Sequence, residues 1–297
     1  MNILITGSSG FIGRNLVKKL RNDHDLFTID KNETKDKFNK QHFVCDLSDY
    51  SCLLKIDDPI DVVYHFGSAS SILSYKGYEA QLADSEIQQF INILKFSQLK
   101  RVKKFIYPST ASLYSSNNHS KGIVLSPSNI YATVKFTEEQ IAKHYSGDTK
   151  TLGLRIFMAY GPGEESKQNR ASPISLFIQD ILNGKSPLVF GDGTQTRDPI
   201  FINDLVEILV NILRVPNAVG VRDICTGNLT SFNDIISKIN MIASTNITPT
   251  YIPRPKSYID GVTGDPSFAK EILGRKFISV DEGIKLMVNA FRTNYEK

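Results

Sequence analysis

The stretch NILITGSSGFIGRNLVKKLRN, residues 2–22, decides the fold. It begins with a short apolar run that is typical of a β-strand, and from Phe11 onward its apolar residues recur at helical spacing. Between the two lie Gly7, Gly10 and Gly13, in a G-x-x-G-x-x-G spacing. The order of strand, glycine-rich turn and helix predicts the first βα unit of a parallel α/β sheet.

The glycine-rich turn is suited to an anion. Glycines allow a tight turn, let the backbone approach a pyrophosphate closely, and leave the N–H groups of the helix N-terminus pointing toward it. A strand-to-helix turn often needs a glycine for its own geometry, so the spacing alone is weak support for a ligand site. Its position between the first strand and the first helix strengthens the interpretation and predicts a dinucleotide at this turn.

Acidic residues end the second and third expected strands. Asp30 follows Gly13 by seventeen residues, and a carboxylate there accepts ribose hydroxyls and repels a 2′-phosphate, which favours NAD. Lys31 and Lys35 lie close by in the sequence and keep NADP as the alternative. Asp46 is placed either to meet the adenine amino group or to cap a helix, and its position alone does not decide between the two roles.

Strands and helices alternate over the first 160 residues. The expected strands are 2–6, 26–30, 41–46, 61–67, 103–109 and 151–157, and the expected helices are 11–22, 78–99 and 129–145. This alternation predicts parallel βαβ units, and the apolar strands fit a doubly wound Rossmann sheet that is covered on both faces.

A smaller domain is expected after this sheet. A loop rich in glycine and polar residues follows residue 160, and further helices are expected at 172–184 and 203–214. We predict a mixed α/β substrate domain that is built onto the first. The predicted boundaries are 1–160, with 191–225 returning, for the dinucleotide domain, and 161–190 with 226–297 for the substrate domain.

Composition excludes several classes of protein. Of the 297 residues 41% are hydrophobic and 22% charged, and the net charge of +4 is spread out, without a basic run of the kind that binds nucleic acid. The sequence shows neither an apolar run long enough to span a membrane nor a signal peptide, so we expect a cytoplasmic protein. Cys45, Cys52 and Cys225 lack metal-ligand spacing and are expected to be free buried thiols, with no metal site.

Tyr131 and Lys135 form a Y-x-x-x-K pair. On a helix they share one face, about 6 Å apart at Cβ. Among twelve tyrosines one such match is expected by chance, and the hydroxyl-rich stretch FIYPSTASLYSSNN at 105–118 just before it is what raises its significance. As a base at neutral pH, a phenol must lose about three pKa units, or ~4 kcal/mol. A lysine ammonium about 4 Å away supplies about that amount at an effective dielectric near 20, and an oxidised nicotinamide adds to it.

Together these motifs resemble the extended short-chain dehydrogenase/reductase superfamily, and within it the nucleotide-sugar epimerases and dehydratases. The resemblance covers essentially the whole chain. It is carried by TGSSGFIG (6–13), DL (46–47), YHFGSAS (64–70), YPSTASLY (107–114), YATVK (131–135), LRIFMAYGPG (154–163) and GDGTQTRDPIFINDL (191–205).

The resemblance implies a role for each matching residue. Tyr131 would be the base, Lys135 would hold the cofactor ribose and lower the pKa of Tyr131, and Thr110 would hydrogen-bond the reacting oxygen. Arg197 and Arg254 would bind the diphosphate of a nucleotide sugar, with a surface salt bridge as the alternative for either. The implied NAD-binding residues are Gly7, Gly10, Phe11, Ile12, Gly13, Asp30, Asp46, Leu47, Phe66, Gly67, Ser68, Tyr131 and Lys135.

The residues after Thr110 narrow the reaction. The 4,6-dehydratases of this family carry an Asp-Glu pair there and its decarboxylases a Glu, whereas this chain has Ala111 and Ser112, neither of which titrates near neutrality. The resemblance is therefore closest to the 4-epimerases of the UDP-glucose type, which need only the tyrosine base and NAD. We expect a homodimeric nucleotide-sugar 4-epimerase acting through a transient 4-keto sugar, on UDP-glucose and UDP-galactose or on UDP-N-acetylhexosamines.

Two alternatives remain open: an NAD(P)H-dependent 4-ketosugar reductase, and a non-catalytic dinucleotide sensor. Several departures from the family pattern leave the sugar and the nucleotide undecided. Met158 and Asp84 stand where the family commonly has asparagines, and Lys256-Ser257 replace an expected Gly-Asp.

Overall fold

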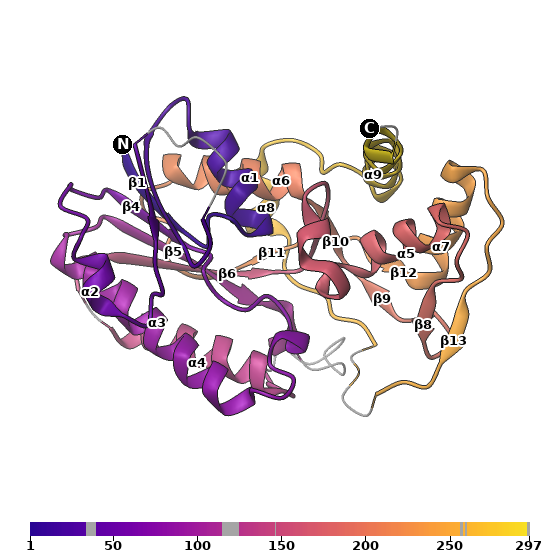
Figure 1. The fold of residues 1–297 in the computed structure, drawn as a ribbon, viewed down its shortest axis with the longest axis horizontal. Coiled ribbons are helices and arrows are strands. Elements are labelled where there is room, and N and C mark those ends of the chain that lie inside the picture. Colours follow the sequence, from indigo (N-terminus) through magenta and orange to yellow (C-terminus); the bar gives the residue numbers. More distant parts are fainter. Residues whose placement is uncertain (34–39, 115–124, 146, 256–257, 259, 296–297) are drawn as a thin grey trace. The chain divides into compact units, whose positions relative to one another are not determined.

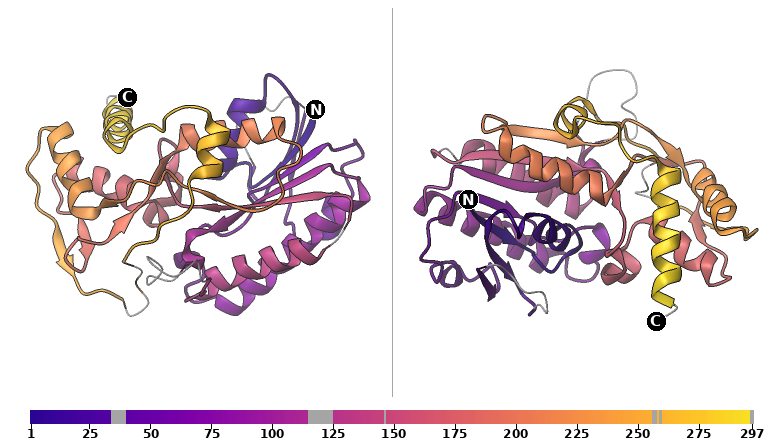
Figure 2. Two further views of the ribbon diagram at one scale, coloured as in Figure 1. Left: turned by 180° about the vertical axis from the view of Figure 1, so that it is seen from behind. Right: turned by 90° about the horizontal axis from the view of Figure 1, so that it is seen from above.

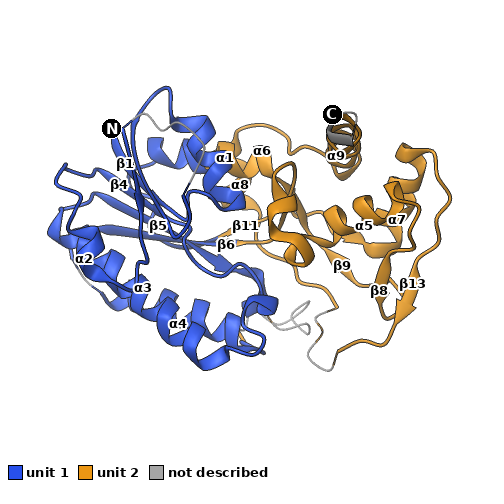
Figure 3. Ribbon diagram, in the orientation of Figure 1, with its two compact units in different colours: residues 1–113, 127–155, 209–222 blue, residues 114–126, 156–208, 223–297 orange. Residues whose placement is uncertain are grey.

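The computed structural model describes residues 1–33, 40–114, 125–145, 147–255, 258 and 260–295. The chain divides into two compact units (Figure 3). The first comprises Met1–Leu113, Pro127–Arg155 and Leu209–Arg222, and the second Tyr114–Ser126, Ile156–Ile208 and Asp223–Lys297. Of the segment 191–225 that was expected to return to the first unit, the part that does so is thus Leu209–Arg222.

A seven-stranded sheet forms the centre of the first unit (Figure 1). Its order is β11-β6-β5-β4-β1-β2-β3. The strands are β1 (Asn2–Thr6), β2 (Asp25–Asp30), β3 (Gln41–Val44), β4 (Val62–His65), β5 (Lys104–Thr110), β6 (Lys150–Ile156) and β11 (Gly220–Ile224). The pairs β1–β2, β1–β4, β2–β3 and β4–β5 are parallel, which confirms the predicted doubly wound Rossmann sheet.

Helices cover both faces of this sheet. They are α1 (Phe11–Leu20), α2 (Tyr50–Leu53), α3 (Glu79–Leu99) and α4 (Ile130–His144), with the short 3₁₀ turns η1 (Ile72–Ser74), η2 (Ala111–Leu113) and η4 (Ile212–Arg214). Figure 1 shows α1 on one face, and α3 and α4 on the other, where Figure 2 shows the latter two running side by side. The α3 side chains Phe90, Ile93 and Leu94 are buried in the sheet's core.

The second unit contains short paired strands and several helices. Its strands pair as β10 (Pro199–Phe201) with β7 (Met158–Tyr160), β12 (Thr230–Ser231) with β9 (Thr196–Arg197), and β13 (Thr250–Ile252) with β8 (Leu188–Phe190). Its helices are η3 (Glu164–Arg170), α5 (Pro173–Leu182), α6 (Ile202–Asn211), α7 (Phe232–Ala243), α8 (Ser267–Leu273) and α9 (Val280–Tyr295), of which α6 ends within the first unit. The helix α7 packs against α5 and α9.

The turn after β3 bears on two expectations. Strand β3 ends at Val44, so Asp46 lies in the turn after the strand rather than at its end. The turn between β3 and α2 brings Cys45 and Cys52 together, with their Cα atoms 6.2 Å apart, a separation that a disulfide can span, so the expectation of free thiols is not confirmed for this pair. Cys225 is free and buried, as expected. Within the described residues, no helix has the length and apolarity needed to cross a membrane.

Candidate active site

Tyr131 and Lys135 lie one helical turn apart on α4. The helix begins here because the Asn129 side chain caps it, accepting a hydrogen bond from the backbone N–H of Ala132 at 2.9 Å. This start places the phenol in the first turn and the lysine in the next, and both side chains are buried. The expected i, i+4 pair is therefore present, on the helix that was expected to carry it.

Thr110 is the last residue of β5 and is buried. The Thr110 hydroxyl lies close enough to the Tyr131 phenol to act on its pKa. Thr110 Oγ1 also accepts from the backbone N–H of Ser112 at 3.1 Å, which fixes the side chain at the start of η2. The structure thus brings Thr110, Tyr131 and Lys135 together in the first unit, although the sequence between β5 and α4 includes residues 115–124, which lie outside the described part of the chain.

Burial raises the pKa of Tyr131, while the charge of Lys135 and the Thr110 hydroxyl act to lower it. The carboxylates of Glu86 and Glu138 add to the rise. The expectation from the sequence took account of the lysine and an oxidised nicotinamide but not of burial or of these carboxylates, and we therefore overestimated how readily the phenol ionises in the protein by itself. Neither glutamate was singled out from the sequence, although Glu138 follows Lys135 by three residues and so shares its helix face.

The glycine-rich turn has the close backbone packing that a pyrophosphate site requires. Gly7 has φ +66°, and a Cβ there would lie 2.3 Å from the Phe66 carbonyl oxygen. A Cβ on Gly13 would lie 2.2 Å from the Gly7 oxygen. Gly10 is the N-cap of α1 and offers no side chain to the helix N-terminus. These residues fit NAD, because the tight turn leaves a side-chain-free helix N-terminus for the diphosphate.

The segment after β4 runs beside this turn. The backbone N–H of Phe66 donates to the Thr6 carbonyl at 3.1 Å, and that of Gly67 donates to Thr6 Oγ1 at 3.2 Å. Ser68 follows in the same loop. The expected NAD-binding residues of these two segments are therefore neighbours in the structure.

Asp30 ends β2, and its carboxylate accepts from the backbone N–H of Ser9 at 2.9 Å and from that of Asn32 at 3.0 Å. It thereby links the glycine-rich turn to the strand end where a ribose is expected. Lys31 pairs with Asp46 at 3.1 Å, and Lys35 lies outside the described residues.

Asp46 does not cap α2. The cap is Asp49, whose side chain accepts from the backbone N–H of Ser51, so that alternative for Asp46 is wrong. Burial acts to raise the pKa of Asp46, but hydrogen bonds from Ser48 and the nearby charge of Lys31 hold it below its ordinary value. Leu47 is buried, and its carbonyl accepts from the Asn92 side chain at 2.8 Å.

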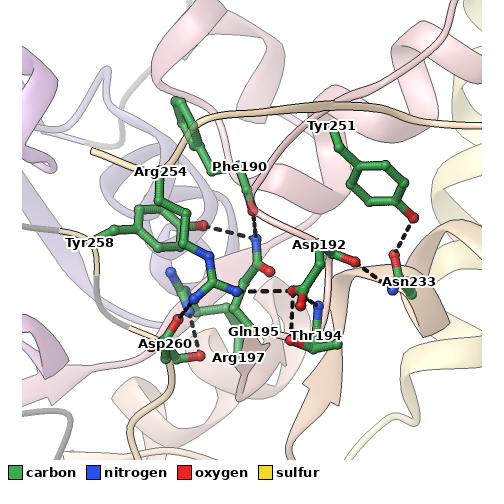
Figure 4. Close-up of polar contacts among 10 residues, drawn as sticks. All are labelled: Phe190, Asp192, Thr194, Gln195, Arg197, Asn233, Tyr251, Arg254, Tyr258 and Asp260. Carbon is green, nitrogen blue, oxygen red and sulfur yellow. Dashed lines mark hydrogen bonds and ion pairs between the residues drawn. The ribbon is translucent and has the colours of Figure 1, made fainter. Parts of the chain in front are cut away.

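Arg197 and Arg254 both belong to the second unit, and Figure 4 shows the polar contacts around them. The Arg197 guanidinium lies 5.3 Å from the ring centroids of both Phe232 and Tyr258, and its Nη1 donates to the Thr196 carbonyl at 2.7 Å. Burial lowers the pKa of Arg197. The two aromatic rings thus hold this guanidinium in place. The contacts of the described residues include no carboxylate that pairs with it.

Arg254 is held differently. Its Nη2 lies 2.9 Å from Asp192 Oδ1, and its Nη1 pairs with Asp260. These two ion pairs correspond to the salt-bridge alternative that the sequence left open. Arg254 nevertheless lines a cavity of about 430 Å³, together with Asp192, Thr194, Gln195, Thr196, Asp260 and Gly261.

The departures from the family pattern fall in several places. Met158 is half-buried in β7, and its N–H donates to the Asp198 carbonyl at 3.2 Å. Asp84 is exposed on α3, and Lys256 and Ser257 lie outside the described residues. Across the described ranges, no group of three or more His, Cys, Asp or Glu side chains is placed to hold a metal ion.

Comparison with known proteins gives one family and several full-length relatives. The sequence profile of the NAD dependent epimerase/dehydratase family matches residues 3–225. A protein of Methanocaldococcus jannaschii, provisionally named UDP-glucose 4-epimerase, is 29% identical over 98% of this chain and 99% of its own length. An ADP-L-glycero-D-manno-heptose-6-epimerase of Thiobacillus denitrificans is 27% identical over 95% of this chain and 86% of its own length.

A solved structure agrees with these matches. The UDP-glucose 4-epimerase of Thermotoga maritima, crystallised with UDP-glucose, superimposes with a TM-score of 0.89 at 26% identity. The match covers 99% of this chain and 100% of the Thermotoga chain.

Proposed function

Because the chain belongs to the NAD-dependent epimerase/dehydratase family, we propose that it is a nucleotide-sugar 4-epimerase that acts on UDP-hexoses or UDP-N-acetylhexosamines. The observation that carries this proposal is the site around Thr110. Its hydroxyl meets the phenol of Tyr131, and the two residues that follow it are Ala111 and Ser112. The site therefore offers a base for a sugar hydroxyl without the carboxylates that an elimination requires.

In this proposal each residue of the first unit has one task. Tyr131 removes the proton from the sugar 4-hydroxyl and returns it later. Thr110 hydrogen-bonds the same oxygen, and Lys135 holds the cofactor ribose. The chemistry that bound NAD supplies is reversible acceptance of a hydride from the sugar carbon. The resulting 4-keto sugar turns over in the site, and reduction on its other face gives the epimer.

We assign NAD to the first unit and the nucleotide sugar to the second. The glycine-rich turn with Asp30 and Asp46 supports the first assignment, and Arg197 with Arg254 supports the second, since arginine suits a diphosphate. A homodimer formed through α3 and α4 and a cytoplasmic location are predictions that accompany this proposal.

A product assay tests whether the reaction takes place at C4 of the sugar. The purified protein should be incubated with UDP-glucose, UDP-N-acetylglucosamine and ADP-heptose in separate reactions, and the products separated by chromatography. We expect interconversion at C4 of a UDP-sugar without added reductant. Epimerisation of ADP-heptose at C6 alone would assign the second activity named among the relatives, and NAD(P)H-dependent reduction of a 4-keto sugar alone would assign the reductase.

A further inference from the structure

Two buried carboxylates surround the ammonium group of Lys135. Its Nζ lies 2.9 and 3.1 Å from the two oxygens of Glu138, and 3.9 Å from Oε2 of Glu86. The exposed fractions of the side chains are 1% for Lys135 and Glu138 and 3% for Glu86. Glu138 comes from the same helix as the lysine, whereas Glu86 reaches it from α3. A single cation is thus shared between two acids that water does not screen.

Glu86 is fixed by groups other than the lysine. Its carboxylate accepts hydrogen bonds from the Tyr75 hydroxyl and from the backbone N–H of Ala69. Because these donors are neutral, they hold the carboxylate in place without adding a positive charge beside it. The charge balance around the Tyr131 phenol therefore depends on Lys135, Glu86 and Glu138.

The two tyrosines and the histidine that face this cluster keep one charge state near neutral pH. Burial raises the pKa of Tyr75 and of Tyr107, so both stay protonated. Burial and the charge of Lys135 lower the pKa of His65 to about 3, so its ring stays neutral. Glu139, the remaining neighbour on α4, is bound to Arg155 at 2.7 Å and to Ser109 at 2.5 Å.

Glu138 is the exception. Burial raises its pKa to about 7, against the opposing effect of the Lys135 charge. Its carboxyl group therefore holds a proton at higher pH than an ordinary glutamate does, directly beside the lysine that acts on Tyr131.

We propose that Glu138, assisted by Glu86, sets the basicity of Tyr131 through Lys135. An ionised Glu138 cancels part of the positive potential of the ammonium group at the phenol, and a protonated Glu138 restores it. Glu138 is a positioning residue, since it contacts the lysine and not the reacting atoms. The inference rests on the proposed function, in which Tyr131 is the base.

The direct test is the ionisation of Tyr131 itself. Tyrosinate absorbance is followed as the pH rises in the NAD-loaded protein, and the same titration of Tyr131→Phe is subtracted to isolate one phenol. The measurement is repeated in the Glu138→Gln background. We expect the pKa of Tyr131 to fall by about one unit, the effect of a unit charge roughly 10 Å away at an effective dielectric near 20. The acid limb of the turnover profile should move by the same amount.

Two further variants distinguish the effect of the Glu138 charge from a general effect of changing a buried acid. Glu138→Asp keeps the charge and should leave the pKa of Tyr131 within a few tenths of a unit of its original value. Glu164→Gln removes another buried acid that lies three residues from its lysine partner, Lys167, and should leave the phenol titration unchanged. If Glu138→Gln fails to fold, Glu86→Gln should lower the pKa of Tyr131 in the same direction by a smaller amount.

An unchanged or raised pKa of Tyr131 in Glu138→Gln would overturn the inference, as would the same downward shift in Glu164→Gln. The phenol titration needs NAD but no turnover. A shifted phenol in a protein that epimerises no sugar would therefore defeat the proposed function and leave this inference standing.

Discussion

The carboxylate of Glu139 on α4 receives the Arg155 guanidinium of β6 with two parallel hydrogen bonds, Nε to Oε1 at 2.8 Å and Nη2 to Oε2 at 2.7 Å. The exposed fractions of the two side chains are 13% for Arg155 and 3% for Glu139. Oε1 also accepts from the Ser109 hydroxyl at 2.5 Å. One acid thus joins the helix that carries Tyr131 to two strands of the sheet, and one of these strands ends at Thr110.

Replacing Glu139 with Gln should destabilise the first unit strongly. The Arg155 guanidinium would face an uncharged amide in a largely buried position, and breaking such a pair costs about 3 kcal/mol of unfolding free energy. Urea unfolding measures the loss. The control is Asp58→Asn, which breaks the half-exposed pair with Lys40 and should leave the unfolding free energy nearly unchanged. Equal effects of the two variants would contradict the role of Glu139.

The close packing around Gly7 predicts that a side chain at this position would prevent NAD binding. A Cβ there meets the Phe66 carbonyl at 2.3 Å, and the residue has φ +66°. Gly7→Ala should abolish NAD binding, measured by calorimetry, because the turn must open to admit the methyl group. Gly77→Ala is the matched control: φ is +85°, and a Cβ there would meet no heavy atom of the described residues within 4 Å. It should cost about 1 kcal/mol of stability and leave NAD binding intact.

Tyr131→Phe separates an enzyme from a sensor. Losing the general base should lower kcat at least ~100-fold, while NAD still binds because the glycine-rich turn is untouched.

Thr110→Val removes one hydrogen bond to the reacting oxygen and should lower kcat about 10- to 100-fold. Both values come from initial rates with the substrate identified in the product assay. Full turnover in Tyr131→Phe would show that another group is the base.

The two arginines of the second unit should differ in their contribution to substrate binding. Arg197 rests on two aromatic rings, whereas Arg254 must leave Asp192 and Asp260 before it can serve a diphosphate. Arg197→Ala should therefore raise the Kd for UDP about 10- to 100-fold, and Arg254→Ala should raise it less. Competition binding with UDP compares the two, and a larger effect of Arg254→Ala would reverse the assignment.

Short-range patterns predicted most of the fold and the pairing of Tyr131 with Lys135. Periodicity and glycine spacing depend on neighbours in the sequence, and they located the strand ends that carry Asp30 and Thr110. The partners of Lys135 could not be read in the same way. Glu86 lies in another helix, and its effect depends on burial, which only the folded chain defines. Likewise, the acids that bind Arg254 come from two separate loops.

The roles of residues in turns were also poorly predicted from the sequence. Asp46 and Asp49 are both plausible helix caps in the sequence CDLSDYS, and only the structure shows that Asp49 takes the role. The proximity of Cys45 to Cys52 depends on the same turn. A residue-level error of this kind leaves the sheet order intact, because strand pairing is set by the apolar runs on either side.

The buried His65 should make the stability of the folded protein fall as the pH falls. Its ring is buried, its Nδ1 lies 2.8 Å from Thr6 Oγ1, and Phe90 and Phe105 pack against it. Burial and the charge of Lys135 lower the pKa of His65 from 6.5 to about 3. The unfolded chain therefore binds a proton below pH 6.5 that the folded chain does not take up until the pH is near 3. This contribution to stability is complete above pH 6.5 and is lost as the pH falls through that window.

Urea unfolding at pH 7.5 and 5.5 tests the prediction. The loss of unfolding free energy between the two pH values should be about 1 kcal/mol smaller in His65→Phe than in the original protein, since about 1.4 kcal/mol corresponds to one pH unit per proton. His24→Phe is the control, because His24 is only partly buried and its pKa is lowered less. An equal pH dependence in the original protein and in His65→Phe would mean that His65 takes up a proton in the folded state, against the desolvation argument.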